Sequence, residues 1–218
     1  MTFYQPIAQF ADGSIAEVTF EHGNRIFTTN TNSADVVTRS INEAVAIYGP
    51  PPISRVHQPV GLHIQRSLPY GAIALLQLFV GKHCLLYQLM HRDAWPPRNL
   101  YTFFKDERFC FTGASAEEVV PALQREFGFK VRVALDLGHV ASRRLGREDL
   151  RWAGLEQLAM EMMRIEMMRP DEFPQSAWGQ RALPLQLVAF ACANSFISYE
   201  LSRIVFNHGL LPFLYRGS

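Results

Sequence analysis

Apolar and polar residues alternate along the first part of the chain in a pattern typical of β-strands. Residues 14–20 and 25–29 both alternate, and His22, Gly23 and Asn24 between them favour a turn, so the two runs predict a hairpin. A helix should follow, because Asn32 or Ser33 can cap a run whose apolar residues recur every three or four positions. These apolar residues are Val36, Val37, Ile41, Ala44, Val45 and Tyr48, and the run ends at Gly49, Pro50, Pro51 and Pro52.

The middle of the chain predicts three further strands in close succession. They span residues 60–65, 72–80 and 84–89, with Gly81, Lys82 and His83 as a tight turn between the last two. Because the connections are short, we expect these strands to pair in an antiparallel manner.

Beyond this region, strands and helices alternate. The pattern predicts a helix at 97–105, a strand at 109–112, a helix ending near Phe127 and a strand at 131–137. Such alternation favours parallel pairing of the strands. Pro121 implies that the second of these helices either starts near Val120 or is kinked. The remainder predicts helices near 138–145, 153–164 and 184–207, with a loop at 170–174.

Composition narrows the class of protein. The 218 residues suit one α/β domain spanning 1–218, with residues 1–50 as an integral part of it. The net charge of +1 gives no electrostatic reason to expect a nucleic-acid-binding protein. Three scattered cysteines argue against a disulfide framework and against a structural zinc site.

The ends of the chain and its apolar runs bear on location. No signal or transit segment is evident at the N-terminus, and no apolar run reaches about 20 residues, so we expect no membrane span. The expected location is intracellular, in the cytoplasm, the nucleus or both.

Several phrases, in order, resemble the 3′–5′ exonuclease domain of the Werner-syndrome type, in the DEDD superfamily. They are VGLHIQ, ALLQLFVGKHCLLYQL, FCFTGASAEEVVPAL, VALDLGHVASRRLG, RWAGLEQLA and SAWGQRALPLQLVAFACANSFISYEL, and they cover about residues 55–205. The shorter plant members of the family also carry the N-terminal hairpin and helix. The resemblance implies an α/β, RNase H-like fold, with a mixed sheet of five or six strands flanked by helices.

The chemistry of that family requires four carboxylates that hold two divalent metal ions, and usually a tyrosine that orients the attacking water. Magnesium and manganese prefer hard anionic oxygen ligands. By resemblance, the matching positions in this chain are His63 and Gln65 on the first strand, Val119, Phe190 in place of tyrosine, and Asn194. Because none of these side chains is a carboxylate, we expect no metal, no cofactor and no hydrolysis.

Substitute metal ligands can be considered among the neighbouring residues. His63 beside two amides offers one good zinc ligand, whereas zinc sites usually have four donors. Glu117 and Glu118 precede Val119, but each position on a helix turns a side chain by about 100°, and acidic residues at a helix N-terminus need no further explanation. For Asp136 and His139, a helix cap and a first helical turn are sufficient.

Two clusters could contact a partner. Arg143, Arg144 and Arg147 could track phosphates, or they could form a solvated helix face. Met162, Met163, Met167 and Met168 could form an adaptable protein-binding surface, or part of this set could fill the core.

The sequence therefore favours a catalytically inactive exonuclease-like protein. We expect it to bind, sequester, redirect or regulate a protein partner, and the resemblance makes a homo-oligomer plausible. The alternative is a nucleic-acid-binding module that retains the exonuclease groove without hydrolysis. No residue names the partner.

Overall fold

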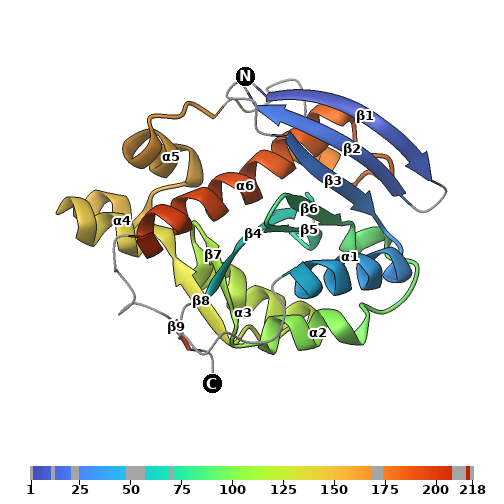
Figure 1. The fold of residues 1–218 in the computed structure, drawn as a ribbon, viewed down its shortest axis with the longest axis horizontal. Helices are drawn as coiled ribbons and strands as arrows, with labels where there is room; N and C mark the ends of the chain where they lie inside the picture. Colours follow the sequence, from blue (N-terminus) through green and yellow to red (C-terminus); the bar gives the residue numbers. More distant parts are fainter. Residues whose placement is uncertain are drawn as a thin grey trace.

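The computed structural model describes residues 2–10, 13–20, 25–47, 57–68, 71–167, 174–207 and 215–216. Within these ranges, nine strands form one sheet, and helices cover both of its faces (Figure 1). Across the sheet the strands lie in the order β1-β2-β3-β6-β5-β4-β7-β8-β9.

The N-terminal strands form one wing of this sheet. β1 (Thr2–Phe10), β2 (Gly13–Phe20) and β3 (Arg25–Thr31) pair in an antiparallel manner, which confirms the predicted hairpin. β3 then pairs in parallel with β6 (His83–Tyr87), so the wing continues the main sheet. For this reason the sheet is wider than the five or six strands that were expected.

The central strands have the mixed pairing that the sequence predicts. β4 (Gln58–Arg66) and β5 (Ile73–Val80) are antiparallel, as are β5 and β6. β4, β7 (Phe109–Gly113) and β8 (Val133–Asp136) are parallel, and β9 (Tyr215–Arg216) adds a short antiparallel edge.

The helices divide between the two faces of the sheet. One apolar cluster contains residues of α1 (Ala34–Ile47), α2 (Arg98–Lys105) and α3 (Ala116–Phe127). On the opposite face, α4 (Leu137–Leu145), α5 (Leu155–Met163) and α6 (Leu185–Asn207) share a second cluster. Three short 3₁₀ turns complete the described elements: η1 (Leu89–His91), η2 (Glu148–Trp152) and η3 (Gln175–Gly179). None of the described helices is long and apolar enough to cross a membrane.

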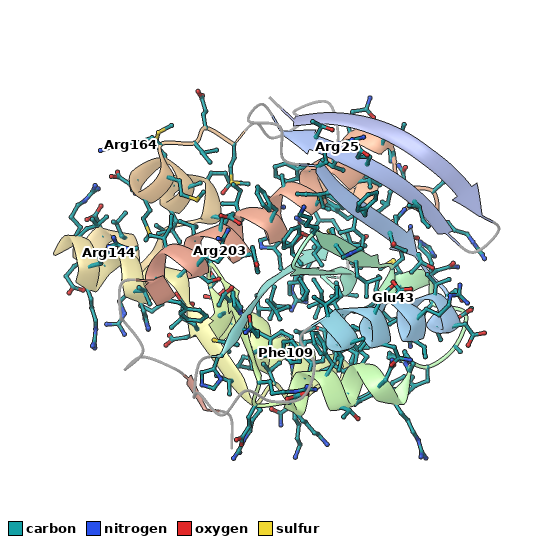
Figure 2. All side chains as sticks on the ribbon, viewed as in Figure 1. Arg25, Glu43, Phe109, Arg144, Arg164 and Arg203 are labelled. Atoms are coloured by element: carbon teal, nitrogen blue, oxygen red, sulfur yellow. The ribbon has the colours of Figure 1, made fainter. Side chains whose placement is uncertain are left out.

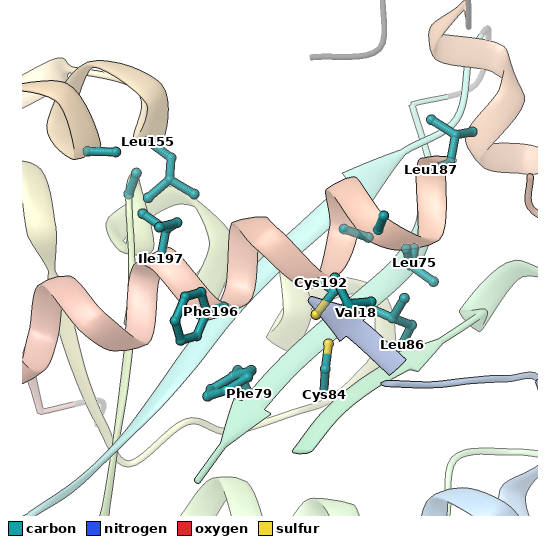
Figure 3. Packing of buried hydrophobic residues seen from close by; sticks show 14 of the residues in the cluster. Val18, Leu75, Phe79, Cys84, Leu86, Leu155, Leu187, Cys192, Phe196 and Ile197 are labelled. Atoms are coloured by element: carbon teal, nitrogen blue, oxygen red, sulfur yellow. The ribbon is translucent and has the colours of Figure 1, made fainter. Parts of the chain in front are cut away.

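α6 crosses the sheet over β4, and the approach is close (Figure 1). A Cβ atom on Gly61 of β4 would lie 1.8 Å from the backbone oxygen of Ser195 on α6. Only glycine permits this approach, because real Cβ contacts do not fall below about 3 Å. Buried residues from α6 and the sheet interlock beneath the helix (Figure 3). This contact fixes which residues of α6 face β4.

Some predicted boundaries are wrong. α3 begins at Ala116 and runs through Pro121, rather than starting near Val120. The proline removes one backbone donor early in the helix, and the rest of the helix is retained. α4 begins at Leu137, inside the range predicted for a strand, since Asp136 caps it. The turn at 22–24, Tyr48, the stretch 49–52 and most of the loop at 170–174 lie outside the described residues.

Candidate functional site

The first part of the candidate site is the C-terminal half of β4. Successive side chains of a strand point to opposite faces of a sheet. Gly61 faces α6, whereas Leu62 and Ile64 contact the apolar cluster under α1, α2 and α3. His63 and Gln65 therefore share the α6 face with Gly61.

The second part of the site is the segment of α6 around Ser195. Asn194 is buried next to Ser195, and Phe190 lies one helical turn earlier. Phe190 is half-buried, and its ring lies 6.4 Å from the ring of Trp178 in η3. The structure thus places two of the predicted positions on α6 opposite the strand that carries His63.

Val119 lies elsewhere in the packing. It is partly buried on α3 and contacts the apolar cluster of the opposite face, the one that also includes Leu62 and Ile64. A hydrophobic side chain at this point of α3 therefore contributes to an ordinary core contact. β4 lies between Val119 and the α6 face.

Burial dominates the electrostatics of His63. The ring is half-buried, but its Nδ1 atom is fully enclosed and has no hydrogen-bond partner among the described residues. Burial lowers the pKa of His63 to about 4, although the carboxylate of Glu156 on α5 acts in the opposite direction. The imidazole is therefore neutral at physiological pH.

Gln77 is a polar residue of this interface that the sequence reasoning missed. It is the antiparallel partner of His63 on β5 and is fully buried. Its amide oxygen and nitrogen both lack hydrogen-bond partners in the described part of the chain. A single polar residue in the otherwise apolar run of β5 was the signal that could have revealed it.

Two helix N-termini meet beside the parallel strands. Asp136 Oδ1 accepts hydrogen bonds from the backbone nitrogens of Gly138 (2.9 Å) and His139 (3.2 Å), which confirms the predicted helix cap. Asp136 Oδ2 accepts from the backbone nitrogen of Glu117 at 3.3 Å. The Glu117 carboxylate in turn lies 3.1 Å from His139 Nδ1. Glu117 is thus oriented towards His139, and the carboxylate of Asp136 joins the starts of α3 and α4.

The side chains at the candidate site do not fit the two-metal centre of the exonuclease fold. His63, Gln65 and Asn194 are neutral donors, and Val119 offers no donor atom. Magnesium and manganese are held mainly by anionic oxygens. Within the described ranges, no three or more histidine, cysteine, aspartate or glutamate side chains are placed to hold a metal ion together.

The arginine cluster spans the last turn of α4 and the residues directly after it. Arg143 and Arg144 are exposed in the last turn of the helix. Arg147 is held by two carboxylates, at 2.6 Å from Asp149 and 2.8 Å from Glu161. A phosphate would therefore compete with two internal ion pairs for Arg147, whereas Figure 2 shows Arg144 on the outside of the molecule.

The methionines at and after the end of α5 are partly buried and partly exposed. Met162, Met163 and Met167 are partly buried and contact the apolar cluster beneath α6. Met168 lies outside the described residues. At least part of the set therefore fills the core, one of the two readings that the sequence left open.

Comparison with known proteins supports an exonuclease-like fold. No family model matches the sequence. A segment of 108 residues, 50% of the chain, is 27% identical to RISC-interacting clearing 3′–5′ exoribonuclease 1 of Arabidopsis thaliana and covers 54% of it. Over 136 residues the chain is 21% identical to an Arabidopsis thaliana 3′–5′ exonuclease, spanning 62% of this chain and 46% of that protein. The chain thus aligns with about half the length of these curated relatives.

Two solved structures share the fold. Escherichia coli RNase D, an exoribonuclease involved in structured RNA processing, matches with a TM-score of 0.63 and 16% identity, over 83% of this chain and 46% of that chain. The EXO domain of Aedes aegypti Nibbler matches with a TM-score of 0.62 and 14% identity, over 82% and 88% of the two chains. The protein therefore has the α/β, RNase H-like fold of the DEDD exonuclease domains and is similar in sequence to plant 3′–5′ exonucleases.

Proposed function

We propose that this protein is an exonuclease-fold protein that no longer hydrolyses nucleic acid and that acts by binding another protein. One observation carries the proposal: the β4–α6 interface presents a neutral imidazole and two amides where metal-dependent exonucleases need carboxylates. His63 in particular stays neutral because burial lowers its pKa to about 4.

The chemistry of the replacements supports this proposal. Gln65 and Asn194 retain the shapes of glutamate and aspartate but carry no charge. Four carboxylates around an empty metal site repel one another and raise each other's pKa values. Neutral residues avoid that cost, so the fold is retained while the metal ligands are lost.

A protein is the favoured partner. A near-neutral net charge of +1 offers little general attraction to a polyanion. The name of one relative describes it as RISC-interacting, so contact with other proteins is on record for a relative of this fold. We propose that the chain sequesters, redirects or regulates such a partner, and a second copy of the same chain is one candidate.

A second candidate function is binding of single-stranded nucleic acid. Trp152 is 72% exposed, and the guanidinium of Arg151 lies 5.3 Å from its ring centroid. The Trp152 ring is also 6.2 Å from His139, next to the joined starts of α3 and α4. An exposed indole with an arginine beside it is suited to stack on a base.

A nuclease assay tests the loss of hydrolysis. Purified protein should leave labelled single-stranded RNA and recessed DNA intact in magnesium and in manganese. The Asn194→Ala variant is the control, because a contaminating nuclease gives the same signal in both preparations. Metal-dependent shortening from the 3′ end that Asn194→Ala abolishes would overturn the proposal.

A binding assay separates the two candidates. The protein is used for affinity purification from native tissue with and without nuclease treatment, beside the Trp152→Ala variant. A defined protein that survives nuclease treatment and binds both forms supports protein binding. If recovery depends on nucleic acid and on Trp152, the second candidate replaces the first.

A further inference from the structure

Two cysteines face each other between α6 and the sheet. Cys84 lies on β6 and Cys192 on α6, and their sulfur atoms point towards one another in Figure 3. Cys84 is close enough to Cys192 to help raise the pKa of its thiol. Both are buried, with 2% and 0% of their surface exposed. These residues are 108 positions apart in sequence, so the contact joins distant parts of the chain.

Hydroxyl groups complete the surroundings of the pair. Thr28 Oγ1 donates to Cys192 Sγ at 3.2 Å, and Ser195 Oγ lies 3.4 Å from Cys84 Sγ. Burial raises the pKa of the Cys192 thiol, and the neighbouring Cys84 thiol acts in the same direction. Cys192 therefore stays protonated and unreactive while α6 is docked on the sheet.

We propose that Cys84 and Cys192 form a redox modification site, at which a low-molecular-weight disulfide such as oxidised glutathione converts the two thiols into a disulfide. One cysteine, as the thiolate, attacks a sulfur of glutathione disulfide, which yields a mixed disulfide and one reduced glutathione. The second cysteine displaces the other glutathione. The two thiols lose two protons and two electrons, which reduce one glutathione disulfide to two glutathiones.

The packing of α6 on the sheet limits access to the two thiols. Oxidised glutathione cannot reach a sulfur that is enclosed by α6, so attack requires the helix to lift from β6. Oxidation should therefore be slow in the native protein and faster when mild denaturant increases the open population. Cys110 is also buried, on β7, and burial raises the pKa of its thiol, but it belongs to a different apolar cluster. It serves as an internal control for a buried cysteine outside this pair.

The disulfide would also affect the candidate site. A sulfur–sulfur bond is about 2.05 Å long, shorter than any non-bonded contact between two thiols, so the side chains of Cys84 and Cys192 must rotate, or α6 must move towards β6, when it forms. Cys192 lies between Phe190 and Asn194 on α6. Oxidation would thus fix α6 to the sheet and shift the side chains that face His63.

Peptide mapping under non-reducing conditions tests the modification. The full chain is incubated with oxidised glutathione, with and without sub-denaturing urea, then alkylated and digested. We expect a Cys84–Cys192 cross-linked peptide that forms faster in urea, while Cys110 is recovered alkylated. The Cys110→Ser variant should behave like the wild type. Absence of the cross-link in both conditions, or equal pairing with Cys110, would overturn the proposal.

Thermal melts provide an independent measurement. The oxidised protein should melt at a higher temperature than the reduced protein, because a cross-link restricts the unfolded chain. Dithiothreitol should reverse the increase. The Cys192→Ala variant, which places a third alanine between Ala191 and Ala193, should fold but give no difference between the two states. An oxidised wild type that melts no higher than the reduced form contradicts the proposed cross-link of α6 to the sheet.

Discussion

The two faces of the sheet are packed with different kinds of side chain. Under α1, α2 and α3 the core is aromatic, and its rings contact one another at centroid distances near 5 Å. The rings belong to Tyr101, Phe103, Phe104, Phe109, Phe111 and Phe129. The face under α6 also has aromatic contacts, such as Phe79 with Phe196 at 5.2 Å, but small and polar residues lie among them, with Gly61 and Gln77 as the clearest examples.

The polar groups of the α6 face satisfy one another only in part. Hydroxyls of Ser195, Ser198 and Ser202 donate to carbonyls of the same helix, at 3.1, 2.9 and 2.6 Å. His63 Nδ1 and the amide of Gln77 are enclosed without a partner in the described ranges. Unsatisfied buried polar atoms cost stability, and among the described residues the α6 face has three of them, whereas the aromatic cluster has the single hydroxyl of Tyr87. The α6 face is therefore where a function other than folding is expected.

The largest effect should come from the aromatic face. Phe111 is fully buried, and its ring centroid lies 5.2 Å from that of Phe103 and 5.0 Å from that of Phe104. Phe111→Ala should lower the free energy of unfolding by about 3–5 kcal/mol, measured by urea denaturation. Phe27→Ala is the control. Phe27 is 43% exposed, so this substitution should lower the free energy of unfolding by less than about 1 kcal/mol. Similar losses at both positions would contradict the assignment of a packed aromatic core.

The next largest effect should come from adding a methyl group on the other face. Gly61→Ala places a Cβ 1.8 Å from a backbone oxygen of α6, and the helix has to move away. We expect the free energy of unfolding to fall by about 3 kcal/mol, at the upper end of the range for overpacked sites. Gly154→Ala is the matched control, since its new Cβ meets only a flexible Glu156 oxygen at 3.3 Å. If Gly61→Ala is as stable as the control, α6 does not lie so close to β4.

The buried imidazole should make stability depend on pH. The pKa of His63 is lowered from 6.5 to about 4 in the folded protein, so between these values the unfolded chain binds more protons. The free energy of unfolding should therefore fall as the pH drops from about 6.5 to 4, by up to about 3 kcal/mol, and then level off with respect to this group.

Denaturation at several pH values measures this dependence. His63→Gln should remove this component of the pH dependence, whereas His83→Gln, at an exposed position, should retain it. An unchanged slope in the His63 variant would show that His63 is not enclosed as described.

The smallest effect should come from replacing the unpartnered amide. Gln77→Leu removes two buried polar atoms that lack partners while roughly keeping the volume, so we expect stability to rise by about 1 kcal/mol. Gln157→Leu, on the exposed side of α5, is the control and should change little. A destabilised Gln77→Leu protein would mean that the amide is hydrogen-bonded, with His63 as the first partner to test.

Much of the fold follows from local patterns. The periodicity and the cap at Asn32 or Ser33 predict α1, and short turns predict the antiparallel order of β4, β5 and β6. The width of the sheet does not follow, because the pairing of β3 with β6 joins segments more than 50 residues apart. The boundaries near Pro121 and Asp136 do not follow either. The helix α3 starts before Pro121 and continues through it, and Asp136 caps α4 inside the run that was predicted as a strand.

The candidate site was only partly predictable. Strand periodicity places His63 and Gln65 on one face, and helical spacing places Phe190 and Asn194 one turn apart. Gln77 and Glu156 enter only through tertiary contact, Gln77 as the cross-strand partner of His63 and Glu156 as a charge that acts on it. Such neighbours cannot be read from spacing along the chain.

Thermal melts of the native protein and a variant with restored carboxylates test most directly whether this interface has lost its metal site. The variant combines His63→Asp, Gln65→Glu and Asn194→Asp, the three positions that the structure brings together, and both proteins are melted in chelator and in manganese. In chelator the variant should melt lower, by about 2–4 °C for each kcal/mol that charge crowding costs. Manganese should recover part of that loss in the variant and leave the native protein unchanged. A native protein stabilised by manganese, or a variant that neither loses stability in chelator nor gains it from metal, would contradict the assignment of these three positions to a lost metal site.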